Sequence, residues 1–249
     1  MIVGRFLLAA VATLLVAQGA AETPPRIAII IDDLGYHFEA GSRAIDLPGP
    51  VAYAVLPETP NGQRLSRLAH EKGKEVLLHL PLEPIDHRGP TEPGALMLDM
   101  SRTMFQAAFA DAIATVPFAV GVSSHRGSLL TRHPGHMEWL MEEIGEREDL
   151  FFIDSYTTHE SIALKIAAEA GVTATKRDVF LDHERTTDAV AREFERLKAM
   201  ARKRGTAVAI GHPFPETLEV LERELPRLRA EGFELVTISE LIAMQLNRI

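Results

Sequence analysis

Five residues that could bind a metal ion or move a proton stand at the ends of short apolar segments of the sequence. They are Asp32, Asp33, His79, His125 and His212. Imidazole nitrogens and carboxylate oxygens bind divalent transition metals, and both groups also serve as general acids and bases. The chain has no cysteine, so a metal here would be held by histidine and carboxylate and not by sulfur. We therefore predict an active site around one divalent metal ion, with zinc favoured by the imidazoles.

The apolar segments that precede these residues have the character of buried β-strands. Several are apolar without alternation, which is typical of parallel strands that are buried on both faces. The predicted strands are Ile27–Ile31, Val51–Leu56, Glu75–Leu80, Ala119–Val122, Phe151–Ile153, Val179–Leu181, Ala207–Ile210 and Glu234–Thr237.

Amphipathic helical patterns separate the predicted strands. The clearest runs from Asp188 to about Lys203, where Thr187 can cap the start and Gly205 ends the helix. Another begins at Pro215. Strands that alternate with helices indicate βα units and a parallel sheet. About seven or eight such units predict an α/β protein with a closed or nearly closed barrel.

The C-terminal ends of the strands in such a barrel meet at one face, where active sites form. Four of the ten histidines lie at or just beyond the ends of predicted strands, namely His79, His125, His183 and His212. The segment Pro84–Leu98 is rich in proline, glycine and charge, so we expect it to form a loop over the same face. These positions predict one site at the mouth of the barrel.

Two adjacent carboxylates at the end of an apolar strand are costly to bury unless they bind a cation or accept hydrogen bonds. Neighbouring residues of a strand point to opposite faces, so Asp32 and Asp33 can both reach one site only if the chain turns there. Gly35 permits such a turn. The alternative for Asp33 is that it caps a following helix.

Two histidines in unlike surroundings are the candidate imidazole ligands. His79 has apolar neighbours, which suits a neutral ligand but equally a core histidine bonded to a backbone carbonyl. Glu83, four residues on, could be a ligand, a partner of a ligand or a loop carboxylate. His125 lies between Gly121 and Gly127, which allow the backbone to approach a bound molecule closely.

Further polar residues follow the predicted strands and could support the site. Those that could orient a histidine or contribute a ligand, or instead cap helices and bond to loops, are Asp154, Asp182 and His183. Those that could bind the substrate are Ser124, Arg126 and Ser128.

The composition bears on partners and on the compartment. The formal net charge of -9 argues against a nucleic-acid-binding surface, which needs clustered Lys and Arg. Arg5, an apolar run over 6–17 and small residues up to Ala21 have the pattern of a secretory signal peptide, with an uncleaved membrane anchor as the alternative. We expect residues 1–21 to be the signal peptide and residues 22–249 to be one domain in the periplasm or outside the cell.

Seven short motifs occur in a fixed order along the chain. They are IDDLG (31–35), AVLP (54–57), LHLP (78–81), SHRGS (124–128), FIDS (152–155), RDVFLDH (177–183) and GHP (211–213). In these motifs the chain resembles the divergent polysaccharide deacetylase family, a relative of the NodB-type carbohydrate esterases, over roughly Ile27 to Val236. The resemblance implies a distorted (β/α) barrel and metal-dependent hydrolysis of an amide.

The resemblance also implies roles for individual residues. Asp32 corresponds to the general base, Asp33 and His79 to metal ligands, and His212 to the general acid. Where the better-known esterases have two histidines four residues apart, this sequence has His79 and Glu83. His125 is therefore our prediction for the third ligand.

These observations predict a metal-dependent hydrolase that removes an acetyl or similar acyl group from an envelope glycan. One alternative is a non-catalytic module that binds a glycan or a partner protein at the barrel mouth. Another is a metal-dependent phosphoesterase, in which Arg126 and Arg177 would bind one phosphate.

Overall fold

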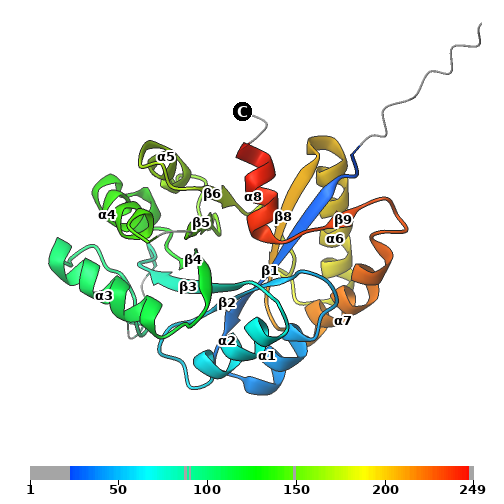
Figure 1. The fold of residues 1–249 in the computed structure, drawn as a ribbon, viewed down its shortest axis with the longest axis horizontal. Coiled ribbons are helices and arrows are strands. Elements are labelled where there is room, and N and C mark those ends of the chain that lie inside the picture. The colour runs from blue at the N-terminus through cyan, green and yellow to red at the C-terminus, as the bar shows by residue number, and fades with distance from the viewer. Residues whose placement is uncertain (1–22, 87–88, 90, 148–149, 247–249) are drawn as a thin grey trace, which may run out of the picture.

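The computed structural model of the chain describes residues 23–86, 89, 91–147 and 150–246. Its strands are β1 (Arg26–Leu34), β2 (Ala52–Val55), β3 (Val76–Leu82), β4 (Ala119–Arg126), β5 (Phe151–Asp154), β6 (Ala174–Lys176), β7 (Val179–Phe180), β8 (Thr206–Gly211) and β9 (Glu234–Leu235). Eight of them follow one another in the order β6-β5-β4-β3-β2-β1-β8-β7, and β9 pairs with β1 beside that path. The pairings between these strands are parallel. The sheet curls into a half-barrel, which confirms the predicted distorted (β/α) barrel (Figure 1).

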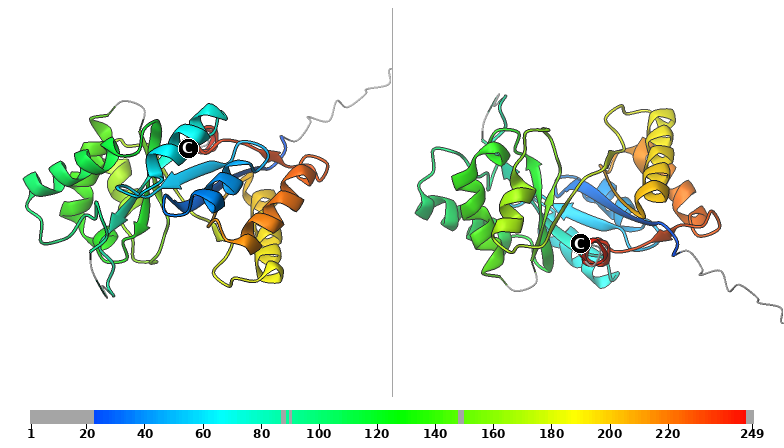
Figure 2. Two further views of the ribbon diagram at one scale, coloured as in Figure 1. Left: turned by 90° about the horizontal axis from the view of Figure 1, so that it is seen from below. Right: turned by 90° about the horizontal axis from the view of Figure 1, so that it is seen from above.

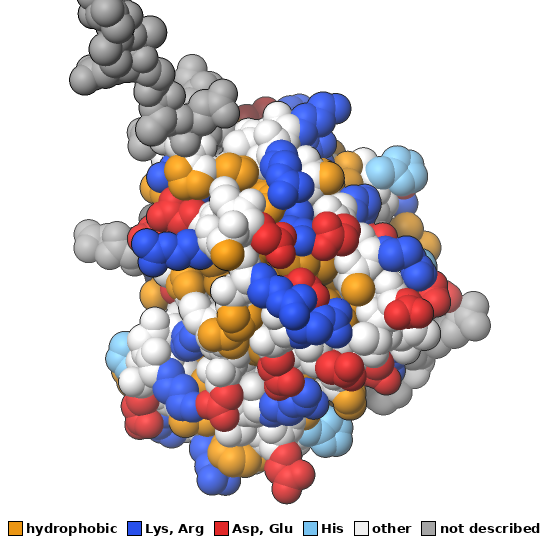
Figure 3. Space-filling model, turned by 90° about the vertical axis from the view of Figure 1, so that its right-hand side faces the viewer, with side chains coloured by type: hydrophobic (Ala, Val, Ile, Leu, Met, Phe, Trp, Pro, Cys, Tyr) orange, Lys and Arg blue, Asp and Glu red, His pale blue; other side chains and the backbone are white. Residues whose placement is uncertain are grey.

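In the described part of the chain, seven helices cover the outside of the curled sheet and an eighth lies on its inner side (Figure 1). The helices are α1 (Phe38–Ile45), α2 (Gly62–Glu71), α3 (Arg102–Ala114), α4 (Pro134–Gly145), α5 (Ala163–Glu169), α6 (Thr187–Arg204), α7 (Pro215–Glu224) and α8 (Ile238–Leu246). Two short 3₁₀ turns, η1 (Leu130–Arg132) and η2 (Leu225–Arg227), precede α4 and follow α7. Helices α3–α5 lie at one end of the sheet and α6 and α7 at the other (Figure 2). On the side of α6 and α7, basic and acidic side chains are interspersed (Figure 3).

Strand β1 shows how the sequence directs side chains to the two faces of the sheet. Ile27, Ile29 and Ile31 belong to the core between the sheet and the outer helices, whereas Ile30 belongs to a separate cluster on the inner face. Side chains alternate along a strand, so Asp32 continues the inner-face row beyond Ile30. The first carboxylate of the pair thus reaches the mouth of the barrel without any distortion of the strand.

The same alternation positions the histidines. On β3 and β8 the inner-face cluster ends two residues before His79 and His212. His125 lies in β4 in register with Pro81, two residues beyond His79 on the neighbouring strand. The three imidazoles therefore belong to the inner side of the sheet, at the C-terminal ends of their strands.

Helix α8 fills the opposite end of the half-barrel. Its apolar side chains pack in the inner-face cluster against β1 and β8. The carboxylate of Glu75, just before β3, accepts a hydrogen bond of 2.8 Å from the backbone N–H of Ile238. Because Glu75 precedes its strand, α8 lies at the N-terminal ends of the strands and leaves the mouth to the polar residues.

Several local details differ from the sequence prediction. Strand β4 runs on to Arg126, so His125 lies within the strand instead of after it. The predicted strand Glu234–Thr237 forms only the two residues of β9, and β6 was not predicted at all. Thr186, not Thr187, caps α6, since its hydroxyl accepts a hydrogen bond of 3.2 Å from an N–H of the first turn.

The described part of the segment between β3 and α3 returns to the end of β3 at the mouth of the barrel, whereas residues 87, 88 and 90 of the predicted loop Pro84–Leu98 lie outside the described residues. Leu96 donates its N–H to Pro81 at 2.9 Å, and Glu83 donates its N–H to Leu96 at 3.0 Å. These bonds fasten the end of the loop to the end of β3, beside the candidate site.

The predicted signal peptide, residues 1–21, lies outside the described residues. In the described ranges, no helix is long and apolar enough to span a bilayer.

Candidate metal centre and active site

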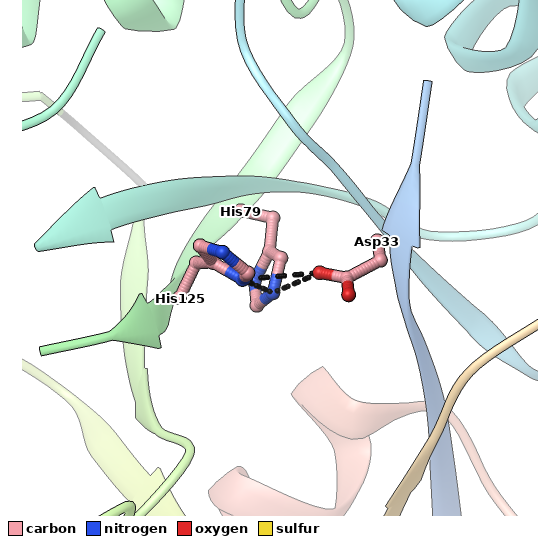
Figure 4. A group of neighbouring side chains, drawn as sticks. All are labelled: Asp33, His79 and His125. Atoms are coloured by element: carbon pink, nitrogen blue, oxygen red, sulfur yellow. Dashed lines mark hydrogen bonds and ion pairs between the residues drawn. The ribbon is translucent and has the colours of Figure 1, made fainter. Parts of the chain in front are cut away.

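Three side chains from three strands point toward one another at the mouth of the barrel (Figure 4). They are Asp33 from β1, His79 from β3 and His125 from β4. Asp33 Oδ1 lies 3.2 Å from His79 Nε2 and 3.0 Å from His125 Nδ1. The two imidazole nitrogens are 3.1 Å apart. Two nitrogens and one oxygen thus form a nearly equilateral triangle.

The backbone of Asp33 explains how two adjacent carboxylates reach one site. The pairing of β1 with β2 shifts register between Ile31 and Leu34, and Asp33 has a φ of 60° in the left-handed region. This bulge turns the side chain of Asp33 away from the outer face and toward His79. Gly35, with a φ of 138°, continues the turn, and a Cβ there would lie 2.1 Å from the hydroxyl oxygen of Thr59. The turn predicted at Gly35 therefore already begins at Asp33.

The outer nitrogen of each histidine has its own partner. His79 Nδ1 lies 2.7 Å from the hydroxyl of Ser123, and His125 Nε2 lies 2.9 Å from Oε2 of Glu92. A ring hydrogen placed on the outer nitrogen leaves the lone pair of the inner nitrogen directed into the triangle. Both rings are thus oriented as a metal site requires.

Asp33 and His125 shift each other's pKa, so that the carboxylate is stabilised in its charged form and the imidazole in its protonated form. Burial alone would raise the pKa of Asp33, but hydrogen bonds from His125 and His79 hold it well below its usual range. Burial would lower the pKa of His125, yet its contacts with Asp33 and Glu92 outweigh that effect and raise the pKa to about 9. In the metal-free protein a proton on His125 thus supplies the positive charge that the carboxylates attract.

The triangle fits a divalent metal ion. Tetrahedral ligands about 2.0–2.1 Å from zinc stand roughly 3.3 Å apart, close to the separations found here. In the part of the chain that the structure describes, Asp33, His79 and His125 form the one group of three such residues close enough to share an ion. Two imidazoles and a carboxylate with no sulfur suit zinc among the common transition metals.

Asp32 lies beside the triangle without being part of it. Its Oδ2 is 3.5 Å from His79 Nε2 and its side chain is buried. Its Oδ1 is buried and receives no hydrogen bond from the described residues. Burial raises the pKa of Asp32, against the opposing charges of His79 and His212. Asp32 therefore has one oxygen without a hydrogen-bond partner among the described residues, and it binds a proton more tightly than an ordinary carboxylate does.

His212 is the third imidazole, and Asp182 holds it. Its Nδ1 lies 2.9 Å from Asp182 Oδ1, while Asp182 Oδ2 accepts the backbone N–H of His212 at 2.6 Å and the hydroxyl of Thr217 at 2.7 Å. Burial would lower the pKa of His212, but Asp182 and the carboxylates of the site raise it above its ordinary value. The Nε2 atom lies 3.6 Å from Asp33 Oδ2 and faces the triangle.

A cleft of about 380 Å³ opens over Asp32, His79, His125 and His212. Its wall also includes Ser124, Arg126, Ser155, Thr157, Arg177, Phe180 and Ile210. Arg177 donates to the carbonyls of Ser155 and Tyr156 at 2.7 and 2.9 Å, which anchors the guanidinium in the wall. The hydroxyl of Ser155 is buried and has no partner among the described residues.

Several of the predicted supporting residues have other partners. Glu83 accepts the N–H of Leu98 at 2.7 Å, and Ser128 accepts that of Ile85 at 3.0 Å, so both brace the loop after β3. Asp154 accepts hydrogen bonds from residues of its own loop, and Ser124 from the N–H of Ser155. His183 is exposed and does not line the cleft. Among the predicted orienting residues, Asp182 is the one that contacts a site histidine.

Two contacts of the triangle were not predicted. Ser123 follows from register, because it lies opposite His79 on the neighbouring strand. Glu92 comes from the irregular segment 84–98. This segment has no periodic pattern from which the direction of an acidic side chain could be predicted.

Comparisons with known proteins identify the family and support the fold. Residues 29–242 match the family described as divergent polysaccharide deacetylase. The uncharacterized protein YibQ of Escherichia coli K12 is 35% identical over 217 residues, 87% of this chain and 67% of that protein. The crystal structure of the uncharacterized protein ATU2773 from Agrobacterium tumefaciens C58 matches with a TM-score of 0.84 and 26% identity, over 90% of this chain and 91% of that one. BA3943 from Bacillus anthracis, a CE4 family pseudoenzyme, shares the fold with a TM-score of 0.53 and 13% identity, over 88% of this chain and 66% of that one.

The chain belongs to the divergent polysaccharide deacetylase family.

Proposed function

We propose that this protein is a metal-dependent hydrolase that removes an acetyl or similar acyl group from an envelope polysaccharide. The observation that carries the proposal is the triangle of Asp33, His79 and His125, flanked by Asp32 and by the Asp182–His212 pair. Amide hydrolysis needs a base and an acid. Asp32 is suited to act as the base, and His212, held by Asp182, is suited to act as the acid.

Asp33, His79 and His125 would hold the metal, for which we propose zinc. When bound, a divalent ion supplies a Lewis acid that polarises the acyl carbonyl and makes a water molecule more acidic. Asp32 Oδ1 then accepts the proton of the attacking water, since it is buried beside the triangle and has no other partner among the described residues. Its raised pKa makes Asp32 a stronger base than an ordinary carboxylate, which favours transfer of this proton.

His212 then delivers a proton to the leaving amine from Nε2. Asp182 holds Nδ1, so the ring can carry a proton on each nitrogen, and the raised pKa of His212 favours this doubly protonated form. Phe180 and Phe214 lie against the ring, with centroids 5.5 and 5.3 Å away, and restrict its rotation. These contacts fix the direction in which the proton leaves.

A glycan suits the cleft, whose wall combines polar side chains such as Ser155 and Arg126 with apolar ones such as Phe180. Ser155 offers a buried hydroxyl with no partner in the described part of the chain, and Arg126 adds a half-exposed guanidinium. Buried polar groups without partners are costly, so a ligand rich in hydroxyl and amide groups would stabilise this wall. The family to which the chain belongs is named for deacetylation of polysaccharides, which agrees with this substrate class.

We further propose that residues 1–21 direct the protein to the periplasm or outside the cell and that residues 22–249 form the mature domain. The signal pattern around Arg5 and Ala21 supports this location. Edman sequencing of the protein recovered from the periplasm should begin at Glu22. An intact Met1 in a membrane fraction would contradict cleavage.

The test is release of acetate from N-acetylated oligosaccharides, including peptidoglycan fragments, by the zinc-loaded protein. We expect release by the wild-type protein and none above background from Asp32→Asn. Glycan binding without acetate release under any divalent metal would refute the hydrolase and favour the non-catalytic module. A chromogenic phosphoester assay separates the remaining alternative, since a deacylase leaves the phosphoester intact.

A further inference from the structure

Glu92 of the loop between β3 and α3 contacts the metal triangle from outside. Its Oε2 lies 2.9 Å from His125 Nε2, and its Oε1 lies 2.9 Å from Nη2 of Arg126. Each carboxylate oxygen therefore has one partner, and the side chain is held between a ring and a guanidinium. The carboxylate group cannot rotate without breaking both contacts.

The contact decides which nitrogen of His125 faces the triangle. His125 Nδ1 lies 3.0 Å from Asp33 Oδ1 and 3.1 Å from His79 Nε2, so a metal in the triangle would bind Nδ1. A neutral imidazole has one hydrogen and one lone pair on its two nitrogens. If the hydrogen on Nε2 is donated to Glu92, the lone pair of Nδ1 points at the metal. A carboxylate partner also makes the ring a stronger ligand than a neutral partner does.

His79 provides a comparison within the same site. Its outer nitrogen faces the hydroxyl of Ser123, which lies on a strand and carries no charge. The outer nitrogen of His125 faces a carboxylate that comes from a loop. Among the described residues of this loop, Glu92 is the charged side chain that contacts His125.

We propose that Glu92 is a positioning residue of the metal centre, which accepts the Nε2 hydrogen of His125 and directs Nδ1 to the metal. Arg126 in turn holds Glu92 in place. The inference rests on the proposed function, because it assumes that the triangle binds a metal. It assigns part of the metal affinity to Glu92, which lies outside the triangle of proposed ligands.

The test is the affinity for Zn²⁺ of the full-length Glu92→Ala and Glu92→Gln variants, measured by competition with a chromogenic chelator. Loss of a partner that orients a metal-binding histidine costs about 10- to 100-fold in metal affinity, and we expect a loss in that range for Glu92→Ala. Glu92→Gln should fall between, since its amide oxygen accepts the hydrogen but carries no charge. Glu160→Ala is the matched control, because Glu160 pairs with Arg132 outside the cleft.

A spectroscopic measurement separates positioning from a general effect on the loop. In the Co²⁺-substituted protein, Glu92→Ala should shift the visible absorption bands, which report the ligand geometry, whereas Glu160→Ala should leave them unchanged. Wild-type zinc affinity in Glu92→Ala would overturn the positioning role and leave the metal centre intact. Equal losses in Glu92→Gln and Glu92→Ala would overturn the hydrogen bond as its cause. Absence of zinc binding by the wild-type protein would overturn the metal centre and this role together.

Discussion

Replacement of Asp182 by asparagine should weaken His212 as an acid without touching the metal ligands. Asp182 accepts three hydrogen bonds, two of them from His212 and one from Thr217. An asparagine can keep the two bonds to Oδ2, but its amide group then faces His212 Nδ1 with hydrogens of its own. The variant therefore loses the bond to the imidazole and the charge that holds the second proton.

The size of the effect follows from this single lost contact. A hydrogen bond to a charged group is worth about 1.5–3 kcal/mol, which corresponds to a roughly 10- to 150-fold loss of the protonated imidazole. Asp182 raises the pKa of His212, so its removal lowers that pKa and the ring loses its proton at a lower pH. Turnover should fall by this factor at pH values above the pKa of the wild-type His212, and the alkaline limb of the pH–rate profile should move to lower pH.

The assay is acetate release from an N-acetylated oligosaccharide across the pH range, with zinc saturating. Thr217→Val is the matched control, because it removes one bond to Asp182 but retains the charge, and it should leave the alkaline limb in place. A loss in Asp182→Asn that is the same at every pH would refute the argument, as would a Thr217→Val variant with the same shift.

Three further outcomes are expected. Asp32→Asn should abolish turnover while the protein keeps its zinc, since Asp32 lies outside the triangle; loss of zinc would contradict this. Zinc binding at pH 7 should release about one proton, because the pKa of His125 is about 9 in the metal-free protein. Calorimetry in buffers of different ionisation enthalpy would detect it, and a buffer-independent enthalpy would rule it out. Gly35→Ala should destabilise the fold by about 1–3 kcal/mol. Gly35 has a φ of 138°, and the added Cβ would lie 2.1 Å from the side chain of Thr59. Thermal denaturation would measure this loss, and an unchanged midpoint would argue against backbone strain at Gly35.

The strands and their ends could be read from the sequence because burial and alternation act locally. Asp32, His79 and His212 each extend an inner-face row of side chains, so their arrival at one mouth follows from parallel pairing and a two-residue period. The prediction that Asp182 orients a histidine also agrees with the contacts, since Asp182 and His212 follow the paired strands β7 and β8.

Other features depend on backbone geometry that residue types do not encode. Asp33 reaches the site through a bulge and a left-handed φ, which aspartate tolerates but does not require. Glu92 approaches His125 because an irregular loop returns to β3, and the sequence gives such a loop no period from which to place a side chain. The orientation of Glu83 away from the triangle depends on the same loop.

We propose that Asp33, His79 and His125 together hold one metal ion. Elemental analysis of the purified mature protein and of its His79→Ala and His125→Ala variants would detect this ion. We expect about one equivalent of metal in the wild-type protein and its loss in both variants, given the single position that three ligands define. No bound metal in the wild-type protein, even after incubation with Zn²⁺, would contradict the claim and the hydrolytic function built on it.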